Sequence, residues 1–278
     1  MAEITAQMVQ ALREATNVGM MECKKALVEA GGDKDKAIKV LRERGVAIAA
    51  KKSSRAANQG LICAFVTADG RNGSLIEVNC ETDFVAKNAG FQSFVKKLAE
   101  LAANRDGVLA DMGRDDVVAK ITEIGENIVA RRSVRFVRAQ PGLLATYIHL
   151  NGKLGVMVEL GCGKEATAST DAFKALALDL TLHVTACAPQ FLTRDQVDPA
   201  LVTAEREIYA KQMQGKPEKM IGKIVDGKMQ KFYGQVCFVE QGFVRDPEVT
   251  VTALLQAKSK EMGDELTIRR FVRFQLGE

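Results

Sequence analysis

The sequence predicts an α+β protein in which a small helical module precedes a duplicated core. Three observations lead to this fold class: short amphipathic stretches fill the first 45 residues, one strand motif occurs twice, and each copy follows a pair of alternating strands joined by a turn. Apolar residues make up 47% and charged residues 27% of the 278 residues, which is typical of a globular chain large enough for two domains.

Three short helices of a ubiquitin-associated-like module are predicted in residues 1–45. The first begins after Thr5, a residue type that suits an N-cap, and the second spans about Met20 to Ala30. The third follows Asp33 as its cap and ends before Gly45. Small bundles of this kind are associated with binding rather than with catalysis.

A repeated motif divides the remainder of the chain. Arg131–Phe136 matches Arg269–Phe274 at five of six positions, 138 residues apart. At the same offset Gly125-Glu126 matches Gly263-Asp264. Each copy therefore indicates a helix, a glycine stop and then an alternating strand.

A hairpin and a helix precede each copy of the motif. Asn-Gly pairs end or form the two turns, a strong signal for antiparallel strands. The predicted hairpins are Leu61–Thr67 with Leu75–Cys80, around a turn that ends in Asn72-Gly73, and Leu143–Leu150 with Lys153–Leu160, around Asn151-Gly152. The predicted helices are Phe91–Ala103 and Asp171–Ala186.

These patterns divide the chain into three parts. Residues 1–55 form the N-terminal helical module with its linker, residues 56–140 form core subdomain N, and residues 141–278 form core subdomain C. Each core subdomain is expected to hold a three-stranded antiparallel sheet covered by helices. Residues 47–58 are small, basic and polar, which indicates a linker with helix at most at its start.

The second core subdomain carries an insertion at about residues 198–235. Apolar residues recur at helical spacing in two stretches, 201–208 and 220–224, and Pro217 is well placed to open the second helix. The insertion therefore predicts an antiparallel coiled-coil arm. The arm either packs on its own domain or makes a dimer or partner contact.

Charge and cysteine usage restrict the classes of partner. The net charge of +4 lies entirely in residues 1–55, which carry 11 basic and 7 acidic residues. A solvated helical face explains this excess; nucleic-acid binding is the alternative, but the chain has no Trp and only 5% aromatic residues. Six scattered cysteines and no 18-residue apolar stretch indicate a reduced, cytoplasmic protein without a membrane span.

No catalytic motif is recognisable. The chain lacks the nucleophile-elbow, zinc-protease and phosphate-loop patterns, and Gly161–Lys164 has the wrong spacing for the last of these. His149 on a hairpin strand and His183 on an apolar helix are interpreted as packed or capping side chains. We therefore expect no enzyme activity, no metal site and no cofactor.

The segment Asn79–Asn88 is unusual because it follows a strand directly. Thr82 or Asp83 can cap a helix with Phe84 in the core, and local physics favours this interpretation slightly. The alternative is an exposed tip where a carboxylate and an aromatic ring stand side by side. Such a tip could act as a wedge into a partner.

Three segments closely resemble the bacterial elongation factor Ts family: Met20–Leu27, Val78–Lys87, and Lys120 with Ile124–Ile128. The resemblance covers nearly the whole chain. It implies a guanine-nucleotide exchange factor of translation elongation, a step of protein biosynthesis. Such a factor binds elongation factor Tu, displaces Mg²⁺ at the partner's nucleotide site and promotes GDP release so that GTP can rebind.

The resemblance also implies roles for individual residues. It places the tip that binds the partner and dislocates Mg²⁺ at Thr82, Asp83, Phe84 and Val85. It implies further partner contacts at Met20, Met21, Ile124, Gly125 and His149. Exchange requires no covalent chemistry in this chain, only contacts that are better with the nucleotide-free partner than with the nucleotide-bound one.

Several alternatives stay open at this point. Many relatives continue into a C-terminal helix that also touches the partner, whereas this chain stops at Phe274–Glu278. Either its C-terminal module is short or that contact is lost, and the property in question is partner affinity rather than exchange itself. A homodimer or a two-to-two complex could form through the arm or the core. An RNA- or ribosome-binding protein is the runner-up, and an enzyme is the third class.

Overall fold

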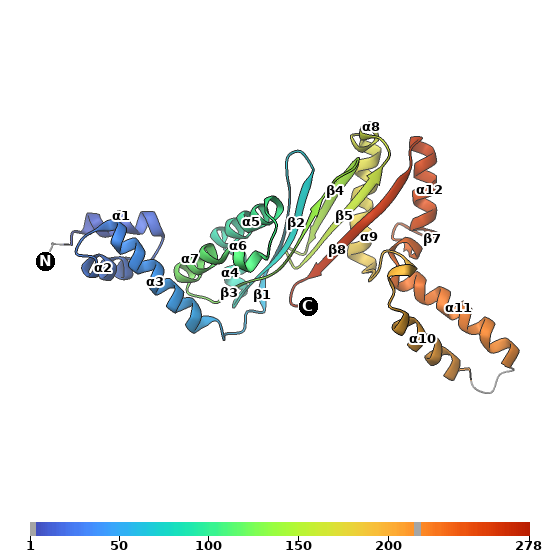
Figure 1. Ribbon diagram of the computed structural model, residues 1–278, viewed down its shortest axis with the longest axis horizontal. Coiled ribbons are helices and arrows are strands. Elements are labelled where there is room, and N and C mark those ends of the chain that lie inside the picture. Colours follow the sequence, from blue (N-terminus) through green and yellow to red (C-terminus); the bar gives the residue numbers. More distant parts are fainter. Residues whose placement is uncertain (1–3, 214–217) are drawn as a thin grey trace.

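Helices and antiparallel sheets alternate along an elongated molecule in the computed structural model, which describes residues 4–213 and 218–278 (Figure 1). The predicted α+β class is confirmed. The N-terminal helices lie at one end and a helical arm projects from the other, with two small sheets between them. None of the helices in the described ranges is both long and apolar enough to cross a membrane.

The first helices follow the predicted pattern: α1 (Ala6–Thr16), α2 (Met20–Glu29) and α3 (Lys34–Lys52). Thr5 caps α1 by accepting a hydrogen bond from the Met8 N–H, and Asp33 caps α3 in the same way. Leu12 and Leu27 are buried in the small core that these helices share. Local capping chemistry therefore sets where α1 and α3 begin.

The predicted end of the third helix before Gly45 is wrong. Helix α3 continues through Gly45 to Lys52, so the first part of the predicted linker is helical. Gly45 is buried where α3 packs on α7 (Arg114–Ile124), and a Cβ atom there would lie 2.8 Å from Thr122 Oγ1. The glycine permits close helix packing instead of terminating the helix.

The first sheet has the order β1-β2-β3, with antiparallel pairs throughout. Its strands are β1 (Gln59–Val66), β2 (Asn72–Cys80) and β3 (Ile128–Val137). Between β2 and β3 lie α4 (Asp83–Lys87), α5 (Ala89–Asn104), α6 (Leu109–Met112) and α7. Asn72 and Gly73 open β2 rather than end the turn, so the strand begins three residues earlier than predicted. The Asn72 N–H donates to Thr67 Oγ1, which closes the turn before Asn72.

The second sheet has the order β4-β5-β8. Its strands are β4 (Gly142–His149), β5 (Leu154–Cys162) and β8 (Leu266–Gln275). Asn151 and Gly152 lie in the turn as predicted, with φ angles of 53° and 87°, but the loop spans residues 150–153 and is two residues longer than predicted, because Leu150 also has a positive φ of 49° and leaves the strand. The long connection contains α8 (Glu165–Ala168), α9 (Asp171–Cys187), η1 (Arg194–Gln196), α10 (Pro199–Lys211), α11 (Glu218–Val236), η2 (Phe238–Glu240), β6 (Gly242–Phe243), β7 (Asp246–Thr250) and α12 (Val251–Met262).

The two sheets share their irregularities as well as their connectivity. The register shifts once between β2 and β3, at Glu77, and once between β5 and β8, at Glu159. The helix before each third strand ends at a left-handed glycine, Gly125 with φ 82° and Gly263 with φ 61°. The sequence repeat therefore coincides with two units of the same local build, which we call the first and second core units.

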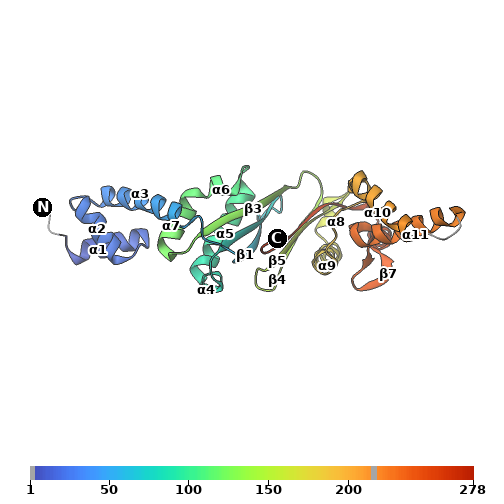
Figure 2. The same cartoon turned by 90° about the horizontal axis from the view of Figure 1, so that it is seen from below.

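The two sheets pack against each other, and helices cover their outer faces (Figures 1 and 2). Helix α5 lies on the first sheet and α9 lies on the second. The cluster between the sheets contains Ile62, Leu75, Phe136, Leu144, Met157 and Phe274. This helix–sheet–sheet–helix arrangement holds the two core units together through an apolar layer.

The arm consists of α10 and α11. Asp198 caps α10, and Pro199 occupies its first turn. Val225, Met229 and Phe232 of α11 are buried in a cluster at the contact with α10. The prediction for Pro217 lies outside the described residues, and contact of the arm with a partner stays a prediction.

The cysteines and one histidine behave as predicted. All six cysteines are free thiols, and Cys23, Cys80, Cys162 and Cys237 are buried. His183 is a fully buried, packed side chain.

Candidate partner-binding tip

The tip is the turn that leads from the end of β2 into α4. Thr82 caps α4, because its Oγ1 accepts a hydrogen bond from the Val85 N–H at 3.3 Å. The interpretation of Thr82 as an N-cap is therefore correct. Helix α4 has only five residues and projects from the side of the first core unit (Figure 2).

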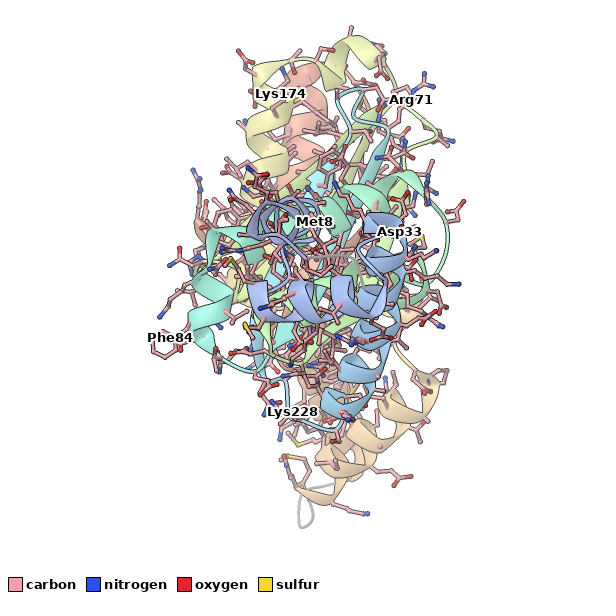
Figure 3. The ribbon with its side chains drawn as sticks, turned by 90° about the vertical axis from the view of Figure 1, so that its left-hand side faces the viewer. Met8, Asp33, Arg71, Phe84, Lys174 and Lys228 are labelled. Atoms are coloured by element: carbon pink, nitrogen blue, oxygen red, sulfur yellow. The ribbon has the colours of Figure 1, made fainter. Side chains whose placement is uncertain are left out.

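The placement of Phe84 in the core is wrong. Its side chain is 80% exposed and points outward from α4 (Figure 3). Ala86, two positions later, is the buried residue of this helix. Since two residues are about 200° apart around a helix, burial of Ala86 turns Phe84 toward solvent.

Asp83 stands beside the ring as a charged carboxylate. Its Oδ2 accepts a hydrogen bond from Lys87 Nζ at 2.6 Å, one helical turn later. This hydrogen bond, together with the positive charge of Lys87, lowers the pKa of Asp83. Asp83 therefore presents a negative charge at the partly exposed surface of the tip at neutral pH.

Glu126 braces the tip from the loop between α7 and β3. Its Oε2 accepts from the Glu81 N–H at 3.1 Å and from the Thr82 N–H at 3.0 Å. Its Oε1 accepts from the Thr82 hydroxyl at 2.6 Å. In return, Glu81 Oε1 accepts from the Asn127 N–H at 2.6 Å, so two loops hold each other in place.

The sequence did not single out Glu126 as a site residue. The signal that could have identified it is the match of Gly125-Glu126 to Gly263-Asp264, because a repeated acidic residue after a helix stop has no simple core role.

The structure brings Ile124 and Gly125 to the tip. Ile124 and Glu123 line one groove together with Thr82, Phe84, Val85 and Asn88. Gly125 is exposed at the end of α7, and its carbonyl accepts a hydrogen bond from the Lys52 ammonium. We call this surface the tip groove.

The second hairpin lies beside the tip. Lys87 and Lys96 line a second groove together with Ile148, Asn151 and Gly152 of the β4–β5 hairpin. Figure 2 shows α4 and this hairpin projecting from the same side of the molecule. His149 ends β4, where its Nδ1 lies 3.2 Å from the Tyr147 hydroxyl and the two rings stack.

Met20 and Met21 lie elsewhere. They open α2 in the N-terminal module, at the far end of the molecule from the arm (Figure 1). Their exposed fractions are 53% and 66%, so they form a separate apolar surface. The predicted site residues thus occupy two surfaces rather than one.

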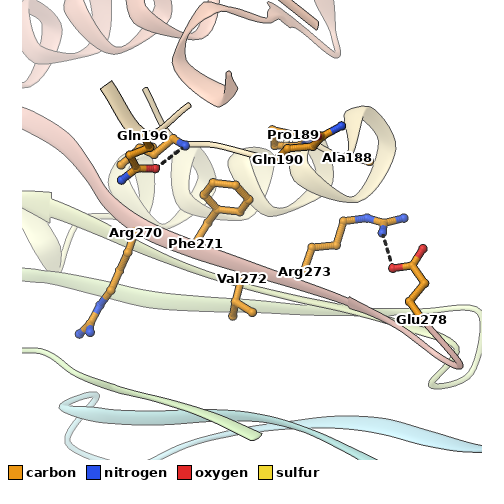
Figure 4. A pocket seen from close by; sticks show the side chains of 10 residues that line it. Ala188, Pro189, Gln190, Gln196, Arg270, Phe271, Val272, Arg273 and Glu278 are labelled. Carbon is orange, nitrogen blue, oxygen red and sulfur yellow. Dashed lines mark hydrogen bonds and ion pairs between the residues drawn. The ribbon is translucent and has the colours of Figure 1, made fainter. Parts of the chain in front are cut away.

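A third concavity carries no tip residue. It lies between β8 and the segment after α9, where Arg273 pairs with Glu278 (Figure 4). Arg270, also at its edge, donates to Glu159. Within residues 4–213 and 218–278, no group of three or more His, Cys, Asp or Glu side chains could hold a metal ion.

The fold and the tip together define a class: an elongated, modular α+β protein that presents an aromatic ring on a braced turn, as suits contact with another macromolecule. A family model for elongation factor TS matches residues 81–278. The chain belongs to the elongation factor Ts family.

Full-length relatives support this membership. Elongation factor Ts of Nitratidesulfovibrio vulgaris (strain DP4) is 44% identical over 277 residues, which cover 99% of this chain and 96% of that protein. The Clostridium kluyveri protein (strain ATCC 8527) is 43% identical over 290 aligned positions, 99% of this chain and 93% of the relative. The Trichlorobacter lovleyi protein is 42% identical, with the same coverage.

Proposed function

We propose that this chain is a guanine-nucleotide exchange factor that binds elongation factor Tu in its GDP-bound and nucleotide-free states. It displaces Mg²⁺ at the partner's nucleotide site and promotes GDP release, so that GTP can rebind. Family membership supports the exchange function. The single observation that carries the mechanism is Phe84, a large apolar ring 80% exposed on a braced turn.

Burial of the exposed Phe84 ring can contribute free energy to the formation of a complex. Burying a phenylalanine side chain stabilises a contact by about 2–3 kcal/mol, and Phe84 can gain most of this only against a partner. A roughly thousandfold faster release of nucleotide requires about 4 kcal/mol. Phe84 therefore supplies part of the energy, and other contacts supply the rest.

Asp83 and Phe84 have different roles at the partner's nucleotide site. Phe84 wedges between partner elements, and the charged Asp83 perturbs the surroundings of the Mg²⁺ ion. Mg²⁺ bridges the nucleotide phosphates to the protein that holds them, so moving its ligands weakens nucleotide binding. By reciprocity, bound nucleotide weakens the partner's affinity for this chain by the same factor.

The remaining predicted residues extend the contact. Ile124 lines the tip groove and Gly125 follows it at the end of α7. His149 ends β4, next to Ile148, which lines the neighbouring groove; this proximity supports contact with the same partner. Met20 and Met21 dock a second region of the partner through the exposed side of α2. We retain the division into residues 1–55, 56–140 and 141–278 as part of this proposal, and we expect no direct contact with nucleic acid.

The decisive experiment measures release of a fluorescent GDP analogue from elongation factor Tu. The wild-type chain should accelerate release, and Phe84→Ala should lower the acceleration at least about tenfold, a loss of roughly 1.4 kcal/mol or more. Because Phe84 is mostly exposed, the variant should keep the wild-type unfolding midpoint.

Val108→Ala is the matched control. Val108 is an apolar side chain 65% exposed at the N-cap of α6, outside both grooves near the tip. It should leave exchange unchanged. An absence of acceleration by the wild-type chain would refute the exchange function, whereas full acceleration by Phe84→Ala would refute only the role of the ring.

A further inference from the structure

We propose that Glu126 is the positioning residue of the tip, and that it orders Phe84 before any partner arrives. The second core unit contains the same turn, braced by Asp264 but without an aromatic ring. This inference rests on the proposed function for its consequence in exchange. Its structural part concerns the isolated chain alone.

Glu126 satisfies groups that α4 cannot satisfy itself. A helix of five residues is far shorter than the roughly 12 residues needed for marginal stability in isolation. The N–H groups of Glu81 and Thr82 precede its first turn and have no partner within the helix, and both donate to Glu126 Oε2. The tip therefore depends on a carboxylate that is 44 residues away from Thr82 in the chain.

The Thr82 hydroxyl links the brace to the cap. It donates to Glu126 Oε1 at 2.6 Å and accepts from the Val85 N–H at 3.3 Å. Because the Thr82 hydroxyl donates its proton to Glu126, a lone pair of Thr82 Oγ1 points toward the Val85 N–H of the helix. Glu126 thereby sets the orientation of the first turn of α4, which carries Phe84.

The second core unit has the same build. Cys80 Sγ donates to the Thr82 carbonyl at 3.2 Å, and Cys162 Sγ donates to the Lys164 carbonyl at the same distance. Asp264 accepts from the Gly163 N–H at 3.1 Å and from the Lys164 N–H at 3.0 Å, as Glu126 does in the first unit.

The two turns differ in what they present. Four residues after the cysteine, the first turn carries Phe84 and the second carries Ala166. Glu165, at the position of Asp83, pairs with Arg138 of the same chain instead of standing beside a ring. The brace therefore belongs to the fold, whereas the ring and the threonine that both caps the short helix and donates to the brace are specific to the first unit, since Lys164 gives α8 no side-chain cap.

Order in the free chain has a consequence for binding. A turn whose backbone is already ordered does not have to become ordered when the complex forms, so more of the burial energy of Phe84 reaches the nucleotide site. Loss of Glu126 should therefore reduce exchange although Phe84 itself is intact. Loss of Asp264 should leave exchange unchanged.

The first test needs no partner. The chain contains no Trp, so Phe84→Trp makes a single-tryptophan reporter at the tip. In this background Glu126→Ala should lower the fluorescence anisotropy of the tryptophan at position 84, and Asp264→Ala should leave it unchanged. Glu126→Gln, which keeps one acceptor for the two N–H groups but none for the hydroxyl, should give an intermediate value.

The second test measures GDP release with Phe84 in place. Glu126→Ala should reduce the acceleration about five- to tenfold, and Asp264→Ala should match the wild type. Unchanged anisotropy in Glu126→Ala overturns the brace, whatever the exchange rate. Equal losses of exchange in the two alanine variants also overturn it, because they indicate general loosening of the core. If the wild-type chain fails to accelerate release, the proposed function fails, while the anisotropy still decides the brace.

Discussion

His183 ties the base of the arm to the second core unit. Its ring is fully buried and stacks between Phe238 and Phe243, with centroid distances of 5.4 and 6.0 Å. Nδ1 accepts from the Val244 N–H at 3.1 Å, so the ring proton lies on Nε2, which donates to Gln241 Oε1 at 2.9 Å. A neutral imidazole satisfies both contacts, whereas a protonated one would lose the first.

Gln241 extends this contact to the arm. Its Nε2 donates to the carbonyl of Cys187 at the end of α9 and to the carbonyl of Gln235 near the end of α11. One histidine and one glutamine thus join the long helix of the second core unit to the arm. Protonation of His183 should therefore weaken the contact between α9 and the arm.

We predict that the chain loses stability in mild acid through His183. Burial lowers the pKa of His183, so the unfolded chain binds the proton more readily than the folded chain. Neutral His183 contributes fully to the free energy of unfolding above the pKa of the unfolded chain, about 6.5. As the pH falls below this value, the free energy of unfolding decreases by at most about 1.4 kcal/mol per pH unit. Urea unfolding at pH 7.5 and 5.0 measures this slope.

Histidine variants isolate the effect from the carboxylates that also titrate in acid. His183→Gln should be less stable at pH 7.5 but should show a shallower pH dependence. His149→Gln replaces the only other histidine and should keep the wild-type slope. An identical slope for His183→Gln and the wild type would contradict the prediction.

Helix α3 connects the N-terminal module to the first core unit as one continuous element. Its early residues, such as Leu41, pack in the module, whereas Ile48 and Ala49 contact the core of the first unit. Between them, Gly45 lets α3 approach α7, and Arg42 pairs with Asp115 at 2.9 Å across the same contact. The helix thereby sets where the module, and with it the exposed methionines of α2, lies relative to the core.

A side chain at residue 45 should separate these helices. Gly45→Leu places a Cβ atom 2.8 Å from Thr122 Oγ1 and 3.4 Å from Val118 Cγ1, before the rest of leucine is accommodated. We expect a loss of roughly 1–3 kcal/mol in the free energy of unfolding, as is usual for overpacking. Thermal or urea unfolding measures it.

The control substitution lies in the arm. Gly227 is a glycine inside α11, and among the described residues nothing beyond its chain neighbours and the backbone of its own helix lies within 4 Å of the position that a Cβ atom would take. Gly227→Leu should therefore be neutral or stabilise the chain by up to about 1 kcal/mol through helix propensity. Equal effects of the two substitutions would mean that Gly45 has no packing role.

Two arginines join the core units reciprocally. Arg132 of the first unit donates to Glu77 at 2.7 Å, stacks 4.2 Å from the centre of the Phe274 ring and donates to the Gln275 carbonyl at 2.9 Å. Its counterpart Arg270 donates to Glu159 at 2.6 Å. It also stacks on Phe136 at 4.2 Å and donates to the Val137 carbonyl at 2.8 Å.

The buried glutamates hold these arginines in place. The side chains of Glu77 and Glu159 are 0% and 4% exposed. Burial opposes the charge of Glu77, but the Gly277 N–H and the Arg132 guanidinium outweigh it and lower the pKa of Glu77. Each unit therefore positions an arginine that binds the third strand of the other unit. These contacts fix the first core unit, which carries the tip, relative to the second core unit, which carries the arm.

We predict that Arg132→Met and Arg270→Met each lower the free energy of unfolding by about 2–4 kcal/mol. Each variant removes a stacked ring contact and a carbonyl hydrogen bond, and leaves a buried glutamate with one arginine fewer. Arg206→Met is the control, because Arg206 pairs with Asp226 on the exposed arm and should contribute less than about 1 kcal/mol. If Arg132→Met also lowered the free energy of unfolding by less than about 1 kcal/mol, the apolar layer alone would join the units.

Much of the local structure was predictable because short-range interactions decide it. Thr5 and Asp33 start helices through their own side-chain oxygens, and Asn151-Gly152 forms a turn because both residues tolerate positive φ. The repeat around Arg131 and Arg269 predicted two units of like order. Each of these signals acts over a few residues, so it survives in the linear sequence.

The tertiary structure decided the features on which function depends. Phe84 faces solvent because Ala86 takes the buried side of a helix too short to bury both. Helix α3 continues through Gly45 because α7, distant in the chain, packs closely there. Glu126 becomes a brace only when folding brings it to Thr82. The linear sequence was enough to predict most elements, their duplication and the family, because these depend on local hydrogen bonds and on residue identity. Only the tertiary structure decides which side chains remain exposed for a partner, because exposure depends on which neighbouring residues compete for burial.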